Sequence, residues 1–219
     1  MLFDLDGTII DSIALILASY RHTLTAHGFA QIADADWMRG VGTPLRVQLT
    51  PWARSPEHLA ELALTYREHN LAHHDQMITA YPGVVELVRQ IQRRGLATGV
   101  VTSKNREGTR RGLALVGLDE TFDVLVCADD VVQPKPHPEP VLKAVAQLGA
   151  DPATTLFVGD SIHDLHSGRA AGVLTGAVLW GPFTRADLAS AEPDFWFSDV
   201  AEMEKLVAGE EQAIGRLGD

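Results

Sequence analysis

Short apolar runs alternate with amphipathic stretches along most of the chain. The runs have the length and composition of strands, and the stretches repeat apolar residues at the helical spacing of three or four positions. Predicted strands cover Met1–Leu5, Ala97–Thr102, Val124–Cys127, Thr155–Gly159 and Leu174–Leu179. Predicted helices cover Val84–Arg94, Arg106–Val116, Pro138–Leu148 and His163–Ala171. This alternation indicates an α/β fold with a Rossmann-like parallel sheet that carries helices on both faces.

A long helical segment interrupts the alternation between the first and second strands. Predicted helices there cover Ser12–His27, about Asp34–Arg39 and Pro56–Ala72. The third has a good start, because Ser55 can cap it and a proline occupies its first turn. We expect residues 14–80 to form an inserted all-helical cap, and residues 1–13 and 81–219 to form the core. The cap would leave the core at the carboxyl end of the first strand and cover that edge as a lid.

Composition and charge narrow the class of protein. The net charge of −11 argues against a general nucleic-acid binder or a binder of anionic membranes. No apolar stretch reaches the ~18 residues of a membrane helix, and no signal peptide is visible, so we expect a cytoplasmic protein. Cys127, the single cysteine, lies in an apolar run, so we expect a buried structural thiol and no intrachain disulfide.

Two carboxylates follow the first strand directly. Asp4 and Asp6 are two positions apart and therefore point to the same face, before Gly7 and Thr8 turn the chain. Carboxylates this close repel each other unless a positive charge lies between them. A divalent cation, a substrate proton or both would relieve the repulsion, and an ordinary exposed acidic turn is the alternative.

Polar groups follow three further predicted strands. Thr102 and Ser103 offer a hydroxyl and backbone N–H groups to an anionic oxygen, or serve as a helix cap. Lys135 lies between two prolines that fix the backbone and could hold the lysine against a phosphate or carboxylates. A stiff surface loop with a solvated lysine is the alternative. Asp160 emerges at a strand tip, and Asp164 lies one helical turn later, where a capping role is the alternative.

These groups should converge, because the carboxyl ends of parallel strands meet at one edge of a sheet. Together they supply several carboxylates, a lysine, a hydroxyl and N–H donors. Such a set suits Mg²⁺ and a phosphoryl group, since the ion prefers hard oxygen ligands and the phosphate needs a cation and donors.

In these motifs the chain resembles the haloacid dehalogenase superfamily. The motifs occur in the family's order: Asp4-x-Asp6-Gly7-Thr8, Thr102, Lys135-Pro136 and Gly159-Asp160-Ser161-x-x-Asp164. Within the superfamily the chain is similar to phosphatases with a helical cap after the first motif, a group that includes phosphoglycolate phosphatases. The resemblance covers the chain from the first strand to about Gly172.

The resemblance implies a mechanism. Asp4 would be the nucleophile that forms an aspartyl-phosphate, and Asp6 would be the general acid and base. Thr102 and the N–H of Ser103 would hold phosphate oxygens, and Lys135 would stabilise Asp4 and the transferring phosphoryl group. The implied Mg²⁺ ligands are Asp4, the backbone carbonyl of Asp6, Asp160 and, directly or through water, Asp164.

Substrate choice would depend on the cap segment from residue 39 to residue 46. Its glycines, Gly42 among them, permit backbone bends, and Arg39 and Arg46 could bind a carboxylate or a second phosphate. A turn between helices with solvated arginines is the alternative. The partner would be a small phosphate ester, and the sequence names neither that ester nor a choice between monomer and homodimer.

The leading hypothesis is a Mg²⁺-dependent phosphatase of a small phosphorylated metabolite, similar to phosphoglycolate phosphatases. A phosphomutase or a pyrophosphatase of the same superfamily is the alternative. The resemblance implies that an acid at the position of Asp6 disfavours dehalogenation. It also implies that phosphonate cleavage would need a lysine in the cap, and residues 14–80 contain none. A phosphate-responsive signalling module is the non-enzymatic alternative, although receiver domains lack a long insert after the first strand.

Overall fold

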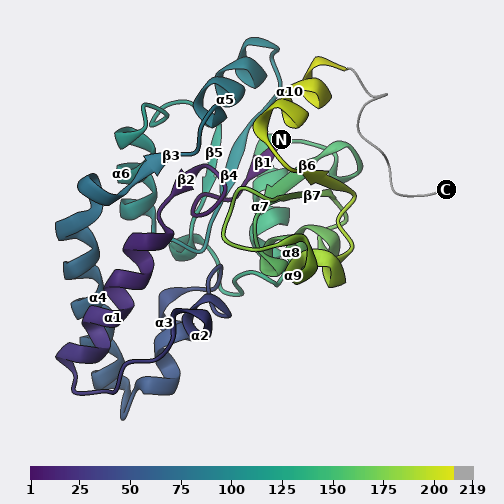
Figure 1. The fold of residues 1–219 in the computed structure, drawn as a ribbon. Coiled ribbons are helices and arrows are strands. Elements are labelled where there is room, and N and C mark those ends of the chain that lie inside the picture. Colours follow the sequence, from purple (N-terminus) through teal and green to yellow (C-terminus); the bar gives the residue numbers. More distant parts are fainter. Residues whose placement is uncertain (210–219) are drawn as a thin grey trace.

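The computed structural model describes residues 1–209 and contains a six-stranded parallel sheet (Figure 1). The strands lie in the order β5 (Val124–Val126), β4 (Gly99–Val101), β1 (Leu2–Phe3), β6 (Leu156–Gly159), β7 (Leu174–Val178) and β8 (Phe195–Phe197). In the register of the central strand, Leu2 lies opposite Gly99 on one side and Phe157 on the other. The predicted α/β class is confirmed. β8 lies outside the predicted strands, because its three-residue run is too short to stand out.

Both faces of the sheet are covered, which explains why its strands show no polar alternation. Helices α5 (Val84–Arg93), α6 (Arg106–Leu115) and α10 (Val200–Ala208) pack on one face, and α7 (Glu139–Leu148) and α8 (Ile162–Ala170) pack on the other. Successive strand residues serve opposite faces, so Phe3 belongs to the first apolar cluster and Leu2 to the second. Short helices complete the set: α9 (Arg185–Leu188) and the 3-10 turns η1 (Thr50–Trp52), η2 (Ala128–Asp130), η3 (Pro152–Thr154) and η4 (Ala189–Ala191).

The helical segment after β1 packs on its own apolar cluster. It comprises α1 (Ile13–Ala26), α2 (Asp34–Met38), α3 (Leu45–Leu49) and α4 (Pro56–Met77), and α1 lies along α4 (Figure 1). In that cluster the ring of Tyr20 stacks on Trp37 at 4.2 Å, near the buried Leu24 and Leu62. We call this segment the cap. The predicted start of α4 is confirmed, because the Ser55 side chain accepts a hydrogen bond from a backbone N–H of the first turn.

A short antiparallel pair marks the place where the chain leaves the core and returns. β2 (Ile10–Asp11) pairs with β3 (Thr79–Ala80), and the N–H of Tyr81 donates to the Ile9 carbonyl at 3.1 Å. Two-residue strands have no sequence signature, and β3 interrupts the expected all-helical character of residues 14–80. The boundaries at residues 14 and 80 stay a prediction.

The structure bears on two further predictions, the burial of the cysteine and the absence of a membrane helix. Cys127 is fully buried, as predicted, and this burial raises the pKa of its thiol. Within residues 1–209, no helix combines the length and apolar character needed to cross a membrane.

Two leucines on α4 test how far the cap depends on its apolar cluster. Leu62 is fully buried, whereas Leu64 is 57% exposed. We expect Leu62→Ala to lower the free energy of unfolding by about 2–5 kcal/mol, because it leaves a cavity. Leu64→Ala, the matched control, should change it by no more than about 0.5 kcal/mol. Urea unfolding followed by circular dichroism measures both, and equal effects would contradict this account of the cap.

Candidate active site

The turn after β1 places Asp4 against Asp160. The Asp4 N–H donates to the Val158 carbonyl at 2.8 Å, so pairing with β6 continues to Asp4. Gly7 adopts a φ of +87°, and a Cβ at this position would lie 2.5 Å from Oδ2 of Asp160. Only glycine fits this close approach without displacing the carboxylate.

Lys135 lies at the centre of the site. Its Nζ donates to Oδ1 of Asp4 at 2.8 Å, to Oδ1 of Asp164 at 2.5 Å and to the Val101 carbonyl at 3.2 Å. Its side chain is 1% exposed. Burial lowers the pKa of Lys135, but the carboxylates of Asp164 and Asp4 outweigh burial and raise the pKa overall. The lysine therefore stays protonated and uses its three donors within the site.

Asp164 and Asp160 differ in how their oxygens are used. Oδ2 of Asp164 accepts from the N–H and the hydroxyl of Ser161, which forms the capping box of α8, and its Oδ1 accepts from Lys135. Asp160 accepts from the Thr8 hydroxyl at Oδ1, while its buried Oδ2 has no hydrogen-bond partner within residues 1–209. Asp160 therefore offers a free ligand atom that Asp164 does not.

The charges of this cluster do not balance. Oxygens of Asp4, Asp160 and Asp164 lie within 4.8 Å of one another, and Lys135 is the cation that bonds to two of them. Burial raises the pKa of Asp4 to about 7, against the effect of Lys135, and burial also raises the pKa of Asp160. A divalent cation would restore the balance, and an all-oxygen donor set with a free buried oxygen suits Mg²⁺.

Asp6 is held by a second lysine that the sequence analysis did not place in the site. Oδ1 of Asp6 accepts from Nζ of Lys104 at 2.8 Å and from the Ser12 hydroxyl at 2.6 Å. Lys104 directly follows the Thr102–Ser103 motif, and this position at the same strand end could have predicted that it belongs to the site. Ser12 offered no comparable signal.

The Thr102–Ser103 strand end touches the cap. Oγ1 of Thr102 accepts from the Lys104 N–H at 3.1 Å, and the Ser103 hydroxyl donates to the Gly42 carbonyl at 2.7 Å. Gly42 has a φ of +97°, and a Cβ there would lie 2.7 Å from the Ser161 hydroxyl. The cap loop therefore lies directly on the core.

A cavity of about 450 Å³ lies between the cap and the core. Its core side includes Asp4, Asp6, Thr102 and Lys104, and its cap side includes Gly42, Arg46, Arg67 and Asn70. Arg39 does not line it: its side chain is 78% exposed and pairs with Asp36 at 3.0 Å. The structure thus brings one of the two predicted cap arginines to the cavity, and Arg67 of α4 supplies a second cation.

Comparisons with known proteins identify the family of the chain. The family model of haloacid dehalogenase-like hydrolases matches residues 1–178. The chain is 40% identical over 203 residues to Pyrophosphatase PpaX from Anoxybacillus flavithermus, covering 93% of this chain and 94% of the relative.

Solved structures show the same fold. A hydrolase from Pseudomonas syringae aligns with a TM-score of 0.85 and 26% identity, covering 97% of this chain and 98% of that one. A predicted phosphoglycolate phosphatase from Haemophilus somnus 129pt aligns with a TM-score of 0.85 and 24% identity, covering 94% and 96%. At that identity the second likeness concerns the fold alone.

The buried lysine gives a test of the electrostatic balance. Lys135→Met leaves Asp4 and Asp164 buried without their cation, so in magnesium-free buffer we expect the free energy of unfolding to fall by about 3–5 kcal/mol. Lys205→Met removes an exposed lysine and should change it by no more than about 0.5 kcal/mol. Urea unfolding of both variants measures the difference. A Lys135→Met protein as stable as the control would contradict the assigned charge balance.

Proposed function

The chain belongs to the haloacid dehalogenase-like hydrolases and is a phosphatase, and from that premise we propose that it hydrolyses inorganic pyrophosphate by Mg²⁺-dependent phosphoryl transfer to Asp4. The observation that carries the proposal is the buried cluster of three carboxylates beside the cavity, two of which bond to a single lysine. Pyrophosphate takes precedence over phosphoglycolate-like esters because a relative that is 40% identical over nearly its whole length is named a pyrophosphatase.

The proposed metal ligands are Asp4, Asp160 and the backbone carbonyl of Asp6. Both oxygens of Asp164 already accept hydrogen bonds, so we assign Asp164 to the positioning of Lys135 and not to direct ligation. When bound, Mg²⁺ would neutralise the excess negative charge and stabilise the charge on the transferring phosphoryl group.

Asp4 and Asp6 divide the chemistry. The Asp4 carboxylate attacks phosphorus, the bond to the bridging oxygen breaks, and an aspartyl-phosphate forms while the first phosphate leaves. Asp6 protonates that leaving oxygen and then takes a proton from the water that attacks the aspartyl-phosphate. Lys104 and Ser12 both bond to Oδ1 of Asp6, which fixes the carboxyl group and leaves Oδ2 for proton transfer.

The strand end after β4 would hold the transferred phosphate. Oγ1 of Thr102 accepts a hydrogen bond from the Lys104 N–H, so its own hydroxyl proton remains available for a phosphate oxygen. The N–H of Ser103 is the second proposed donor. Lys135 sits against Asp4, where it would offset negative charge as the phosphoryl group arrives.

The remaining phosphate would lie toward the cap. Lys104, Arg46 and Arg67 border the cavity from three separate elements, and we propose that the second phosphate binds among these cations. A phosphate ester with a neutral organic group has no second negative charge that could pair with the cap arginines. The cavity therefore favours a substrate with a second anionic group.

The nucleophile and the metal can be tested together. Asp4→Asn should reduce phosphate release from pyrophosphate to the background rate, because an amide cannot form the aspartyl-phosphate. Chelation of divalent ions should abolish release by the unaltered protein, and added Mg²⁺ should restore it. Asp11→Asn, an exposed carboxylate of the same segment, is the matched control and should retain activity. Metal-independent release, or release by Asp4→Asn, would overturn the mechanism.

The cap arginines provide a test of substrate choice. We expect Arg46→Ala to raise the KM for pyrophosphate about 10- to 100-fold, since a hydrogen bond between charged groups contributes roughly 1.5–3 kcal/mol. Arg39→Ala should leave the KM unchanged, because Arg39 lies outside the cavity lining. Steady-state kinetics with pyrophosphate and phosphoglycolate compare the variants. Equal effects of both substitutions would contradict the proposed placement of the second phosphate.

A further inference from the structure

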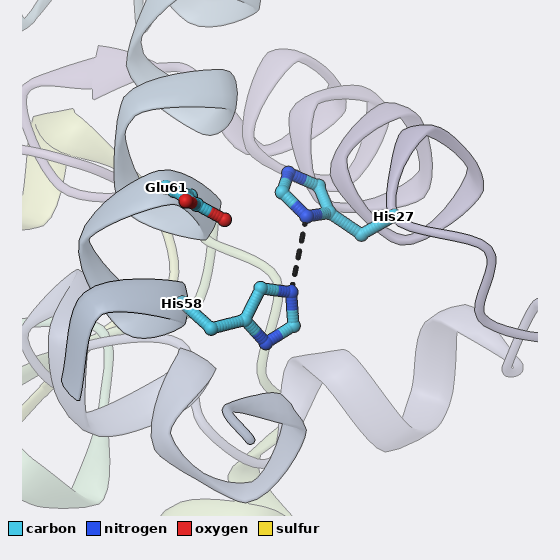
Figure 2. Close-up of side chains that lie close together, drawn as sticks. All are labelled: His27, His58 and Glu61. Atoms are coloured by element: carbon cyan, nitrogen blue, oxygen red, sulfur yellow. Dashed lines mark hydrogen bonds between the residues drawn. The ribbon is translucent and has the colours of Figure 1, made fainter. Parts of the chain in front are cut away.

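Two histidines of the cap meet away from the catalytic cavity. His27 directly follows α1, and His58 lies in the first turn of α4, with Nδ1 of His27 3.1 Å from Nε2 of His58. Glu61 follows one turn after His58, and ligand atoms of all three residues lie within 4.8 Å of one another (Figure 2). We propose that these residues form a Zn²⁺-type transition-metal site that ties the end of α1 to the start of α4.

The spacing of the two ring nitrogens suits such an ion. Zn²⁺ binds imidazole nitrogen at about 2.0–2.1 Å, so two nitrogens at a tetrahedral angle lie roughly 3.3 Å apart. The observed 3.1 Å between Nδ1 of His27 and Nε2 of His58 needs only a small opening of the pair. The Glu61 carboxylate would be the third ligand, and water would complete the coordination.

The other nitrogen of His27 is already arranged as a metal ligand requires. Its Nε2 lies 2.9 Å from Oγ1 of Thr65, and the Thr65 hydroxyl donates to the backbone carbonyl of Glu61 at 3.1 Å. Oγ1 is therefore an acceptor, so the His27 proton sits on Nε2 and the lone pair of Nδ1 faces His58. A metal-binding histidine is held in the same way, by a hydrogen bond from its second ring N–H.

His58 must change its proton position to bind the ion. The Arg54 N–H donates to Nδ1 of His58 at 3.1 Å, so without metal Nε2 carries the proton and donates to His27. Metal binding moves this proton to Nδ1 and releases the Arg54 N–H, which belongs to an exposed residue and can bond to water. We therefore expect weaker binding than at a site without this competing hydrogen bond.

Glu61 adds a third possible metal ligand to the two histidines. It is exposed, and its carboxylate forms no ion pair or hydrogen bond with the described residues, so it is free to ligate and the ion can reach it. His22, His69 and His73 also lie together, with ring centroids 4.4 and 4.3 Å apart, but within residues 1–209 their nitrogens do not converge on one point. The three stacked histidines therefore provide a natural control.

The site differs in ligand type from the acidic cluster at Asp4. Imidazole nitrogens favour Zn²⁺, whereas all-oxygen sites favour Mg²⁺. Excess Mg²⁺ therefore occupies the acidic cluster and leaves the histidine site empty. The test is a calorimetric titration of chelator-treated full-length protein with Zn²⁺ in excess Mg²⁺. We expect one equivalent of Zn²⁺ to bind, and Co²⁺ in its place to give the visible absorption of a tetrahedral ion.

Variants assign the binding to these residues. His58→Gln and Glu61→Gln should abolish or strongly weaken it, Thr65→Val should weaken it about 10- to 100-fold, and His73→Gln should leave it unchanged. Zn²⁺ should raise the unfolding temperature of the unaltered protein and of His73→Gln, but not of His58→Gln. Glu61→Gln alters an exposed side chain, so its effect cannot be ascribed to misfolding. No Zn²⁺ binding, or equal binding by His58→Gln and His73→Gln, would overturn the proposal.

Discussion

The ion pair of Lys135 with Asp4 and Asp164 is the interaction on which the rest of the structure depends. A buried ammonium is costly unless every donor is satisfied, and here each donor has an acceptor. Those acceptors come from the ends of β1 and β4 and from the start of α8, so one side chain joins three separate elements. One lysine cannot neutralise the three carboxylates around it. The same arrangement that joins the elements therefore leaves negative charge that a divalent cation can neutralise.

Structural and chemical roles coincide at several positions of this edge. Asp164 caps α8 through Ser161 and also holds Lys135, so the capping role and the site role are not alternatives. Gly7 is required because a side chain at this position would clash with the Asp160 carboxylate, which lies beside Asp4. A rigid parallel sheet below these groups limits their movement, as precise positioning of reacting groups requires.

The sequence predicted what depends on strand ends and missed what depends on tertiary contacts. Asp4, Lys135 and Asp160 converge because each follows a strand of one parallel sheet, and parallel strand ends share an edge. The bond from Lys104 to Asp6 depends on a lysine rotamer, which no periodicity predicts. Likewise, the sequence offered both Arg39 and Arg46, and only the packing of the cap on the core shows that Arg46 lines the cavity and Arg39 does not. β8 and the β2–β3 pair were not predicted, although β1, β4 and β5 are equally short, because those three lie within the longer predicted strands Met1–Leu5, Ala97–Thr102 and Val124–Cys127.

The contact of Ser103 with Gly42 connects the cap to the proposed phosphate site. Ser103 gives its hydroxyl to the cap, while its N–H is the proposed donor to the transferred phosphate. A cap movement that breaks this contact would free the strand end that positions the phosphate and would also withdraw Arg46 from the cavity. Closure and substrate binding would then favour each other, because each stabilises the arrangement the other requires. The helices of the cap therefore both hold the loop around Gly42 in place and bring Arg67 to the cavity, so their internal packing is part of how the site is built.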